Sequence, residues 1–173
     1  MPNITPGQAP TVIVHHPDPT SWICGLMAEN YDAVGFLPRP TIQQRYVAQH
    51  QYVLQTTAAG RPVGYLLHGA LHPGTTAVIT QHLIRADQRL RGYGEAAIAT
   101  FLARCETVGV ASVRLRCATD LLALAFWQHL GWQMKAVVPG GAARRRTIAV
   151  LTRPCLLPME SLWQAHRQED DHA

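Results

Sequence analysis

The segment RADQRLRGYGE, residues 85–95, joins the end of an apolar run to the start of a helical apolar pattern. If a strand ends before this turn and a helix begins after it, the first backbone amides of the helix lack intrahelical partners. These amides and the helix dipole favour an anion. Gly92 and Gly94 have no side chain that would keep a phosphate away, while Arg89 and Arg91 add positive charge. The segment predicts a phosphate-binding turn.

Two widespread phosphate-binding motifs do not describe this turn. A dinucleotide-binding fingerprint needs Gly-x-Gly-x-x-Gly, and its third glycine position is Ala97 here. A P-loop needs Gly-Lys-Ser/Thr, which does not follow. An ordinary glycine-rich connection between a strand and a helix stays open as the alternative.

The pattern of apolar residues predicts one α/β domain in which strands and helices alternate. Strands are predicted at 11–15, 51–57, 62–70, 75–84, 111–117, 133–139 and 145–152. Helices are predicted at about 20–29, at 41–50 behind a threonine cap, at 94–107 and at 120–131, with a loop at 31–40 and a further helix at 159–166. The single domain spans 1–173, with its core at about 11–152 and peripheral segments at 1–10 and 154–173.

The composition excludes several classes of protein. With 47% hydrophobic and 15% charged residues, the sequence contains no apolar run of about eighteen residues that could span a membrane. The N-terminal stretch is unlike a secretory signal, so we expect a cytoplasmic protein. Neither the nine histidines nor the cysteines, Cys24, Cys105, Cys117 and Cys155, have metal-ligand spacing. We predict reduced thiols and no metal.

The charge balance favours an anionic partner. The net charge is +4 at pH 7, which suits both a phosphate-bearing cofactor and nucleic acid. The sharpest basic cluster, Arg144 to Arg146, is interpreted as the solvated tip of a hairpin, and its role is open.

Two segments resemble motifs of the GNAT superfamily of N-acetyltransferases. Arg89-Leu-Arg-Gly-Tyr-Gly94 matches the Arg/Gln-x-x-Gly-x-Gly/Ala signature of that family. Residues 120–132 match its Asn-x-x-Ala-x-x-Phe-Tyr-x-x-x-Gly-Phe motif at Ala123, Phe126 and Gly131. The order of the predicted elements agrees as well, over residues 11–152. The resemblance implies direct attack of an amine on the thioester of acetyl-CoA, the co-substrate.

The resemblance also implies the fold and the cofactor site. The fold would be a mixed, largely antiparallel sheet, splayed between strands 75–84 and 111–117, flanked by about four helices, with the pantetheine arm of the cofactor in the gap. A backbone amide of Leu83 or Ile84 would contact the oxyanion. The residues expected at acetyl-CoA are Leu83, Ile84, Arg89, Leu90, Arg91, Gly92, Tyr93, Gly94, Phe126 and Trp127.

The sequence departs from the family where acids and bases are expected. Trp127 stands in place of the tyrosine that protonates the leaving thiolate, and Val78 lies near the position of a glutamate base. His82, expected on the same face of its strand as Val78, is a candidate base, and Tyr65 is a weaker candidate acid. Asp120 replaces the family's asparagine and is either a helix cap or a group that orients the amine. A structural role is the alternative for each.

The acceptor site is expected between the two connections at residues 30–40 and 139–146. Its candidate residues are Asn30, Asp32, Phe36 and Arg39, and the sequence does not identify the acceptor or the oligomeric state, monomer or homodimer. A second hypothesis is base modification of DNA or RNA, as in Mom-type proteins of this fold. A third is a non-catalytic homologue that binds CoA.

Overall fold

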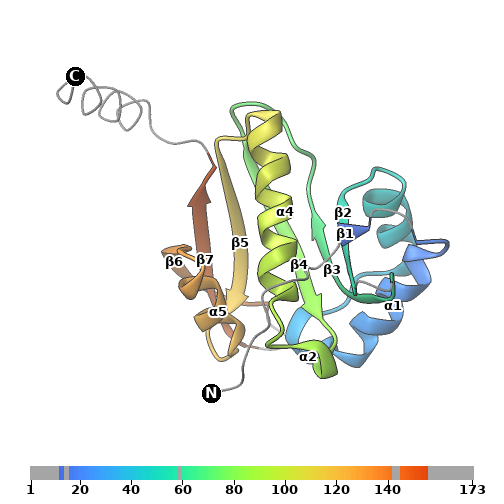
Figure 1. Cartoon of the computed structure of the whole chain (residues 1–173). Helices are drawn as coiled ribbons and strands as arrows, with labels where there is room; N and C mark the ends of the chain where they lie inside the picture. Colours follow the sequence, from blue (N-terminus) through green and yellow to red (C-terminus); the bar gives the residue numbers. More distant parts are fainter. Residues whose placement is uncertain (1–11, 14–15, 58–59, 142–144, 156–173) are drawn as a thin grey trace, which may run out of the picture.

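The structure is a computed structural model that describes residues 12–13, 16–57, 60–141 and 145–155 (Figure 1). Seven strands form one sheet in the order β1-β2-β3-β4-β5-β7-β6, and every neighbouring pair except β4 and β5 is antiparallel. The strands are β1 (Val12–Ile13), β2 (Tyr52–Thr56), β3 (Pro62–His68), β4 (Thr76–Ile84), β5 (Ser112–Ala118), β6 (Gln133–Pro139) and β7 (Thr147–Pro154). The predicted mixed sheet is confirmed.

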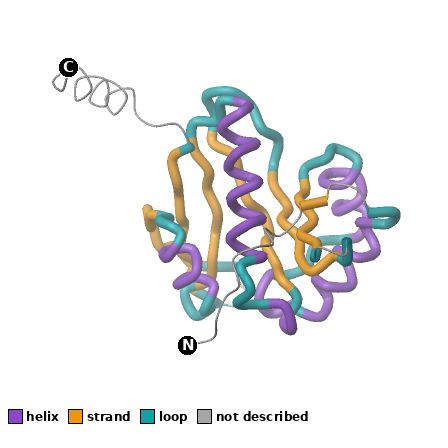
Figure 2. The backbone as a smooth tube through the Cα atoms, in the orientation of Figure 1, coloured by secondary structure: helices purple, strands orange, loops and turns teal. Residues whose placement is uncertain are grey.

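Among the described residues, seven helical segments accompany this sheet, where about four flanking helices were predicted. They are α1 (Pro19–Glu29), α2 (Tyr31–Val34), α3 (Arg39–Thr41), the π-helix η1 (Ile42–Val47), the 3-10 helix η2 (Ala86–Gln88), α4 (Tyr93–Val108) and α5 (Ala123–His129). The order of strands and helices is visible in Figure 2. None of the helices among the described residues has the length and apolar character needed to cross a membrane.

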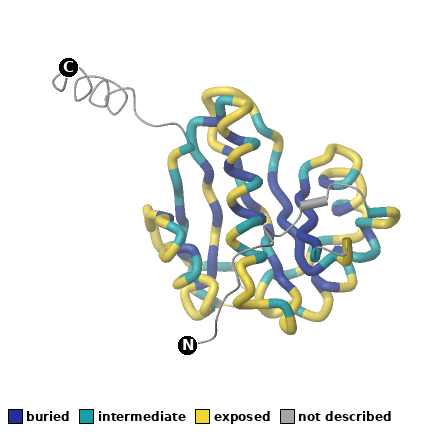
Figure 3. The backbone as a smooth tube through the Cα atoms, in the orientation of Figure 1, coloured by how far each residue is buried: buried dark blue, intermediate teal, exposed yellow. Residues whose placement is uncertain are grey.

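The sheet separates two hydrophobic clusters. The sheet-facing side of α4 packs on one face, where Ile98 and Phe101 join Leu66 of β3. On the other face, α1 and η1 pack against the neighbouring residue Leu67. Figure 3 shows this burial along the central strands and along the inner side of α4. Because Leu66 and Leu67 are adjacent, they point to opposite faces, so the sheet has a helical layer on each side of β3 and β4.

Strands β4 and β5 part after a short contact. Their parallel pairing runs only from Thr76 with Ser112 to Val78 with Arg114. Beyond that point β4 continues to Ile84 and β5 to Ala118 without pairing to each other. The predicted splay between the fourth and fifth strands is confirmed, and we call the space between the diverging ends the gap.

A bulge at Thr80 changes the face of the sheet to which the following side chains of β4 point. Ile79 pairs with His68, and Gln81 pairs with Leu67, which leaves Thr80 without a partner in β3. Thr80 accepts a hydrogen bond from Tyr46 of η1, on the α1 side of the sheet. His82 pairs with Leu66 and therefore lies on the α4 side.

Two local predictions were wrong, and a third is not tested. Residues 31–34 form α2 rather than a loop. Thr41 lies inside a helix that begins at Arg39, and it makes no capping hydrogen bond. The predicted helix at 159–166 falls outside the described residues.

Candidate active site

The turn between β4 and α4 has the backbone that the glycines predicted. Gly92 is the N-cap of α4 with φ +81°, in the left-handed region that favours glycine. Its carbonyl accepts the first helical hydrogen bond, from the Ala96 amide at 3.0 Å. No side chain of the described residues caps this helix end, so the first amides of α4 are available to an anion.

Arg89 supports this turn from within the protein. Its Nε donates to the carbonyl of Ile84 at 3.1 Å, and its terminal nitrogen donates to Oδ1 of Asn30 at 2.9 Å. Asn30 in turn donates to the carbonyl of Leu26 at 2.9 Å. Arg89 thus ties the turn to the ends of β4 and α1, whereas Arg91 is exposed and has no partner in the described residues.

Close packing joins the start of α4 to the α5 side of the gap. A Cβ atom added at Gly94 would lie 3.3 Å from Cζ of Phe126 and 3.4 Å from Cε1 of His82. The His82 ring stacks on Phe126 with centroids 6.0 Å apart and meets Trp127 edge-on at 5.7 Å. Trp127 is buried and packs edge-on against Trp132 at 5.2 Å. These rings close the α4 side of the gap.

His82 is a neutral imidazole in this environment. Burial lowers its pKa to about 4, because the charged form would lose its hydration. Its Nε2 atom is buried and has no hydrogen-bond partner among the described residues. The prediction that His82 shares a face with Val78 was wrong, because the bulge at Thr80 places His82 with Ala77 and Ile79 on the α4 side.

Tyr65 lies on the opposite face and is fully buried. Its hydroxyl donates to Oε1 of Gln81 at 3.1 Å, and Gln81 donates to the carbonyl of Val34 at 3.1 Å. Burial, with a smaller effect from Cys24, raises the pKa of Tyr65 far above its ordinary value. Tyr65 therefore holds its proton tightly and connects β3 and β4 to α2.

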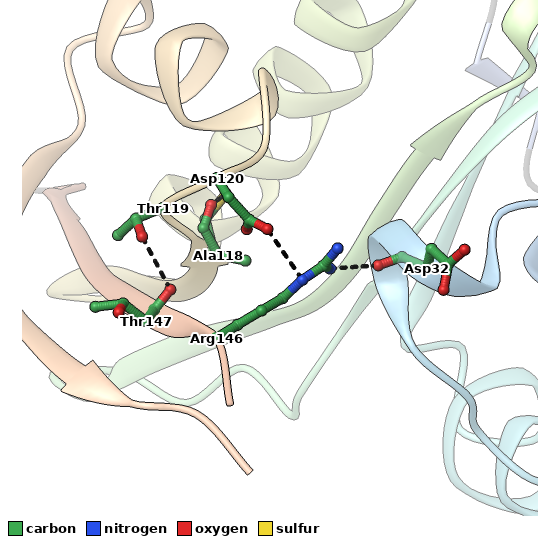
Figure 4. Close-up of polar contacts among 7 residues, drawn as sticks. Asp32, Ala118, Thr119, Asp120, Arg146 and Thr147 are labelled. Atoms are coloured by element: carbon green, nitrogen blue, oxygen red, sulfur yellow. Dashed lines mark hydrogen bonds and ion pairs between the residues drawn. The ribbon is translucent and has the colours of Figure 1, made fainter. Parts of the chain in front are cut away.

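Arg146 bridges the two sides of the gap (Figure 4). Its Nε pairs with Oδ2 of Asp120 at 3.1 Å, and its NH1 donates to the backbone carbonyl of Asp32 in α2. Two expectations are corrected here. Helix α5 begins at Ala123 without a side-chain cap, so Asp120 is not the cap. Arg146 is held by these two contacts and is not part of a solvated hairpin tip.

The other acceptor candidates do not gather in one place. Asn30 contacts the phosphate-binding turn through Arg89, and Asp32 contacts Arg146. Arg39 instead donates to Oγ of Ser21 at 2.8 Å, at the first turn of α1. The Phe36 side chain is exposed. Arg146 was not among the named candidates, although the connection at 139–146 that contains it was expected beside the acceptor site, because its partners are distant in sequence.

Comparison with known proteins places this geometry in a family. A model of the Acetyltransferase (GNAT) family matches residues 24–132, which is more than half of the 173-residue chain. The chain belongs to the GNAT acetyltransferase family. The match begins within α1 and includes the gap, the turn before α4, and α5, whereas the closing strands β6 and β7 lie beyond it.

Solved GNAT structures share the fold at low sequence identity. Ard1 from Thermoplasma volcanium is 21% identical with a TM-score of 0.74, over 87% of this chain and 100% of that chain. The phosphinothricin acetyltransferase Pat from Sinorhizobium meliloti, solved in complex with AcCoA, is 16% identical with a TM-score of 0.70, over 85% and 89%. No functionally curated protein matches the sequence significantly. These similarities establish the fold, and they do not identify the acceptor.

Proposed function

We propose that this GNAT protein transfers an acetyl group from acetyl-CoA to an amine. The observation that carries the proposal is the uncapped start of α4 at the mouth of the gap between β4 and β5. The residues fit the co-substrate, since Gly92 keeps the turn open and Gly94 allows α4 to approach the rings of His82 and Phe126.

The chain would position both reactants. The amides at the start of α4 bind the pyrophosphate, and Arg91 adds charge at the same turn. Acetyl-CoA supplies the activated thioester. The backbone amide of Ile84, which points away from β3 because the adjacent Arg85 amide bonds Val63 there, contacts the developing oxyanion, and Arg89 holds the end of β4 in place through the Ile84 carbonyl. Phe126 and Trp127 exclude water from the α4 side of the gap.

No strong acid is required at the position of Trp127. A thiol of ordinary pKa, about 8.5, leaves as a thiolate without full protonation at neutral pH. The amine must arrive neutral or lose its proton in the gap. Among the candidates, we assign this role to His82, whose ring is neutral and would take the proton from the amine nitrogen after its attack on the thioester, when that nitrogen is most acidic.

Calorimetry with CoA and an acetyl-transfer assay on a set of amines test this proposal. We expect CoA to bind and thiol release from acetyl-CoA to depend on an added amine. Binding without any transfer would instead identify a CoA-binding homologue that lacks catalysis. If calorimetry detects no binding of CoA, the proposal is overturned.

His82→Gln is expected to reduce the rate of transfer about 100-fold, within the range for removal of a general base. CoA affinity should change little, because the pyrophosphate is bound by backbone amides at the start of α4, which the substitution does not alter. The neutral ring is the active form, so the wild-type rate rises as the pH increases through about 4. It should show no inflection near pH 6.5, the ordinary imidazole value.

The exposed His129 of α5 provides the matched control. His129→Gln should leave both the rate and its pH profile unchanged. Wild-type activity in His82→Gln would restrict His82 to packing and leave the amine to deprotonate in solvent.

A further inference from the structure

The face of β5 that is turned away from α4 carries two arginines. Val113, Leu115 and Cys117 join the core beneath α4. Side chains alternate along a strand, so Arg114 and Arg116 point to the other face, and both are exposed. This is the face on which α2 packs beside β4, since Gln81 bonds there to the carbonyl of Val34.

Arg116 stands where the gap opens. Arg114 faces Val78 in the last residue pair that joins β5 to β4. Arg116 lies two residues further along β5, about 7 Å at the usual strand rise. It is therefore the first cation beyond the closed end of the gap, opposite the part of β4 that the bulge at Thr80 turns toward η1.

The positive charge at this opening is not neutralised by the neighbouring acid. Neither Arg114 nor Arg116 forms a hydrogen bond or an ion pair among the described residues. The Asp120 carboxylate is paired with Arg146, which reaches the same face from the start of β7. Two guanidinium groups thus remain available, and a guanidinium binds carboxylate or phosphate through two parallel hydrogen bonds.

The geometry sets the direction from which an acceptor can come. The rings of His82, Phe126 and Trp127 close the gap on the α4 side. An amine that reaches the thioester from the opposite face would pass between Arg116 and the Arg146–Asp120 pair, which lie on that face. An anionic group on that amine would be attracted and oriented there, whereas a cationic one would be repelled.

We propose that the acceptor is a small amine that also carries a carboxylate or a phosphate, and that Arg116 binds this anionic group. The inference rests on the proposed acetyl transfer and names its class of substrate. Arg116 would set the specificity for the acceptor, while the free amine at the other end of the molecule enters the gap toward the end of β4 at Ile84.

Matched pairs of amines test this proposal. The pairs are β-alanine with β-alaninamide and phosphoethanolamine with ethanolamine, and putrescine is the cationic probe. We expect kcat/KM to be at least about 10-fold higher for the anionic member of at least one pair, as a charge-assisted contact provides. Preference within the first pair identifies a carboxylate, and preference within the second identifies a phosphate.

Three variants assign the preference to Arg116. Arg116→Gln should raise KM for the preferred anionic amine about 10- to 100-fold, with little change for its neutral partner. Arg116→Lys should restore part of this loss, because it keeps the charge but not the planar fork. Arg45→Gln, an exposed arginine on η1, removes the same charge elsewhere and should have no effect.

Several results would overturn the inference. Equal rates within both pairs, or an unchanged preference in Arg116→Gln, would reject it while the proposed acetyl transfer still holds. The protein could instead show no preference for anionic amines and bind an oligonucleotide in a salt-sensitive way that Arg116→Gln abolishes. That result would replace the small anionic amine with a nucleic-acid substrate. If CoA binds and no amine is acetylated, the proposed function fails and this inference with it.

Discussion

Gly92→Asp is expected to weaken CoA binding at least about 100-fold while the protein stays folded. The new carboxylate would occupy the N-cap of α4, where it bonds to the same amides that a phosphate needs and repels its charge. A carboxylate at this position stabilises a helix, which offsets the strain of a side chain at φ +81°. Calorimetry with CoA and thermal unfolding measure the two effects separately.

Gly74 provides a matched control for this variant. It also has a positive φ, +71°, and open space where its Cβ would lie, but it sits in the turn before β4 rather than at a helix start. Gly74→Asp lacks the stabilising effect of a helix start, so it should cost somewhat more stability, and it should leave CoA affinity unchanged. Equal binding by both variants would show that the pyrophosphate lies elsewhere.

Gly64→Ala is expected to destabilise the fold by about 3 kcal/mol, near the upper end for overpacking. The added Cβ would lie 2.7 Å from the backbone oxygen of Leu83 and would overlap Cδ1 of Ile84. The side chain of Ile84 can rotate, but the carbonyl belongs to the β3–β4 pairing and cannot move without breaking it. Chemical denaturation measures the loss.

Gly69→Ala tests whether this cost is steric. Gly69 follows β3 directly, and its added Cβ would meet only the backbone oxygen of Val78, at 3.9 Å. We expect the free energy of unfolding of this variant to lie within about 1 kcal/mol of the wild-type value. A similar loss in both variants would show that the contact with Leu83 is not its cause.

The elements on either side of the gap were predictable because their apolar patterns are local. The stripe on α4, from Ala97 through Phe101 to Cys105, is buried as its helical spacing predicted. The alternation of Val113 and Leu115 with Arg114 and Arg116 gave the correct faces of β5. The glycine turn was also predictable, since a positive φ at Gly92 depends on the residue type itself.

The errors arose where distant residues decide the local structure. One unpaired residue, Thr80, reverses the face of His82, and the apolar pattern of β4 does not reveal this shift. Asp120 has the residue type of a helix cap, but Arg146 offers it an ion pair from 26 positions further along the chain. Spacing in the sequence carries no information about that contact.

The early parting of β4 and β5 has a further consequence for their backbones. Two strands that diverge inside a sheet each expose an edge of unpaired amides and carbonyls, which would normally invite another strand to add itself. Here the edges face each other beneath α4 and the rings of Phe126 and Trp127, so a polypeptide has little access. A thin, linear molecule with its own amide groups can enter and take up those bonds. The unpaired part of the sheet therefore favours a thin, linear molecule with amide groups over another polypeptide strand.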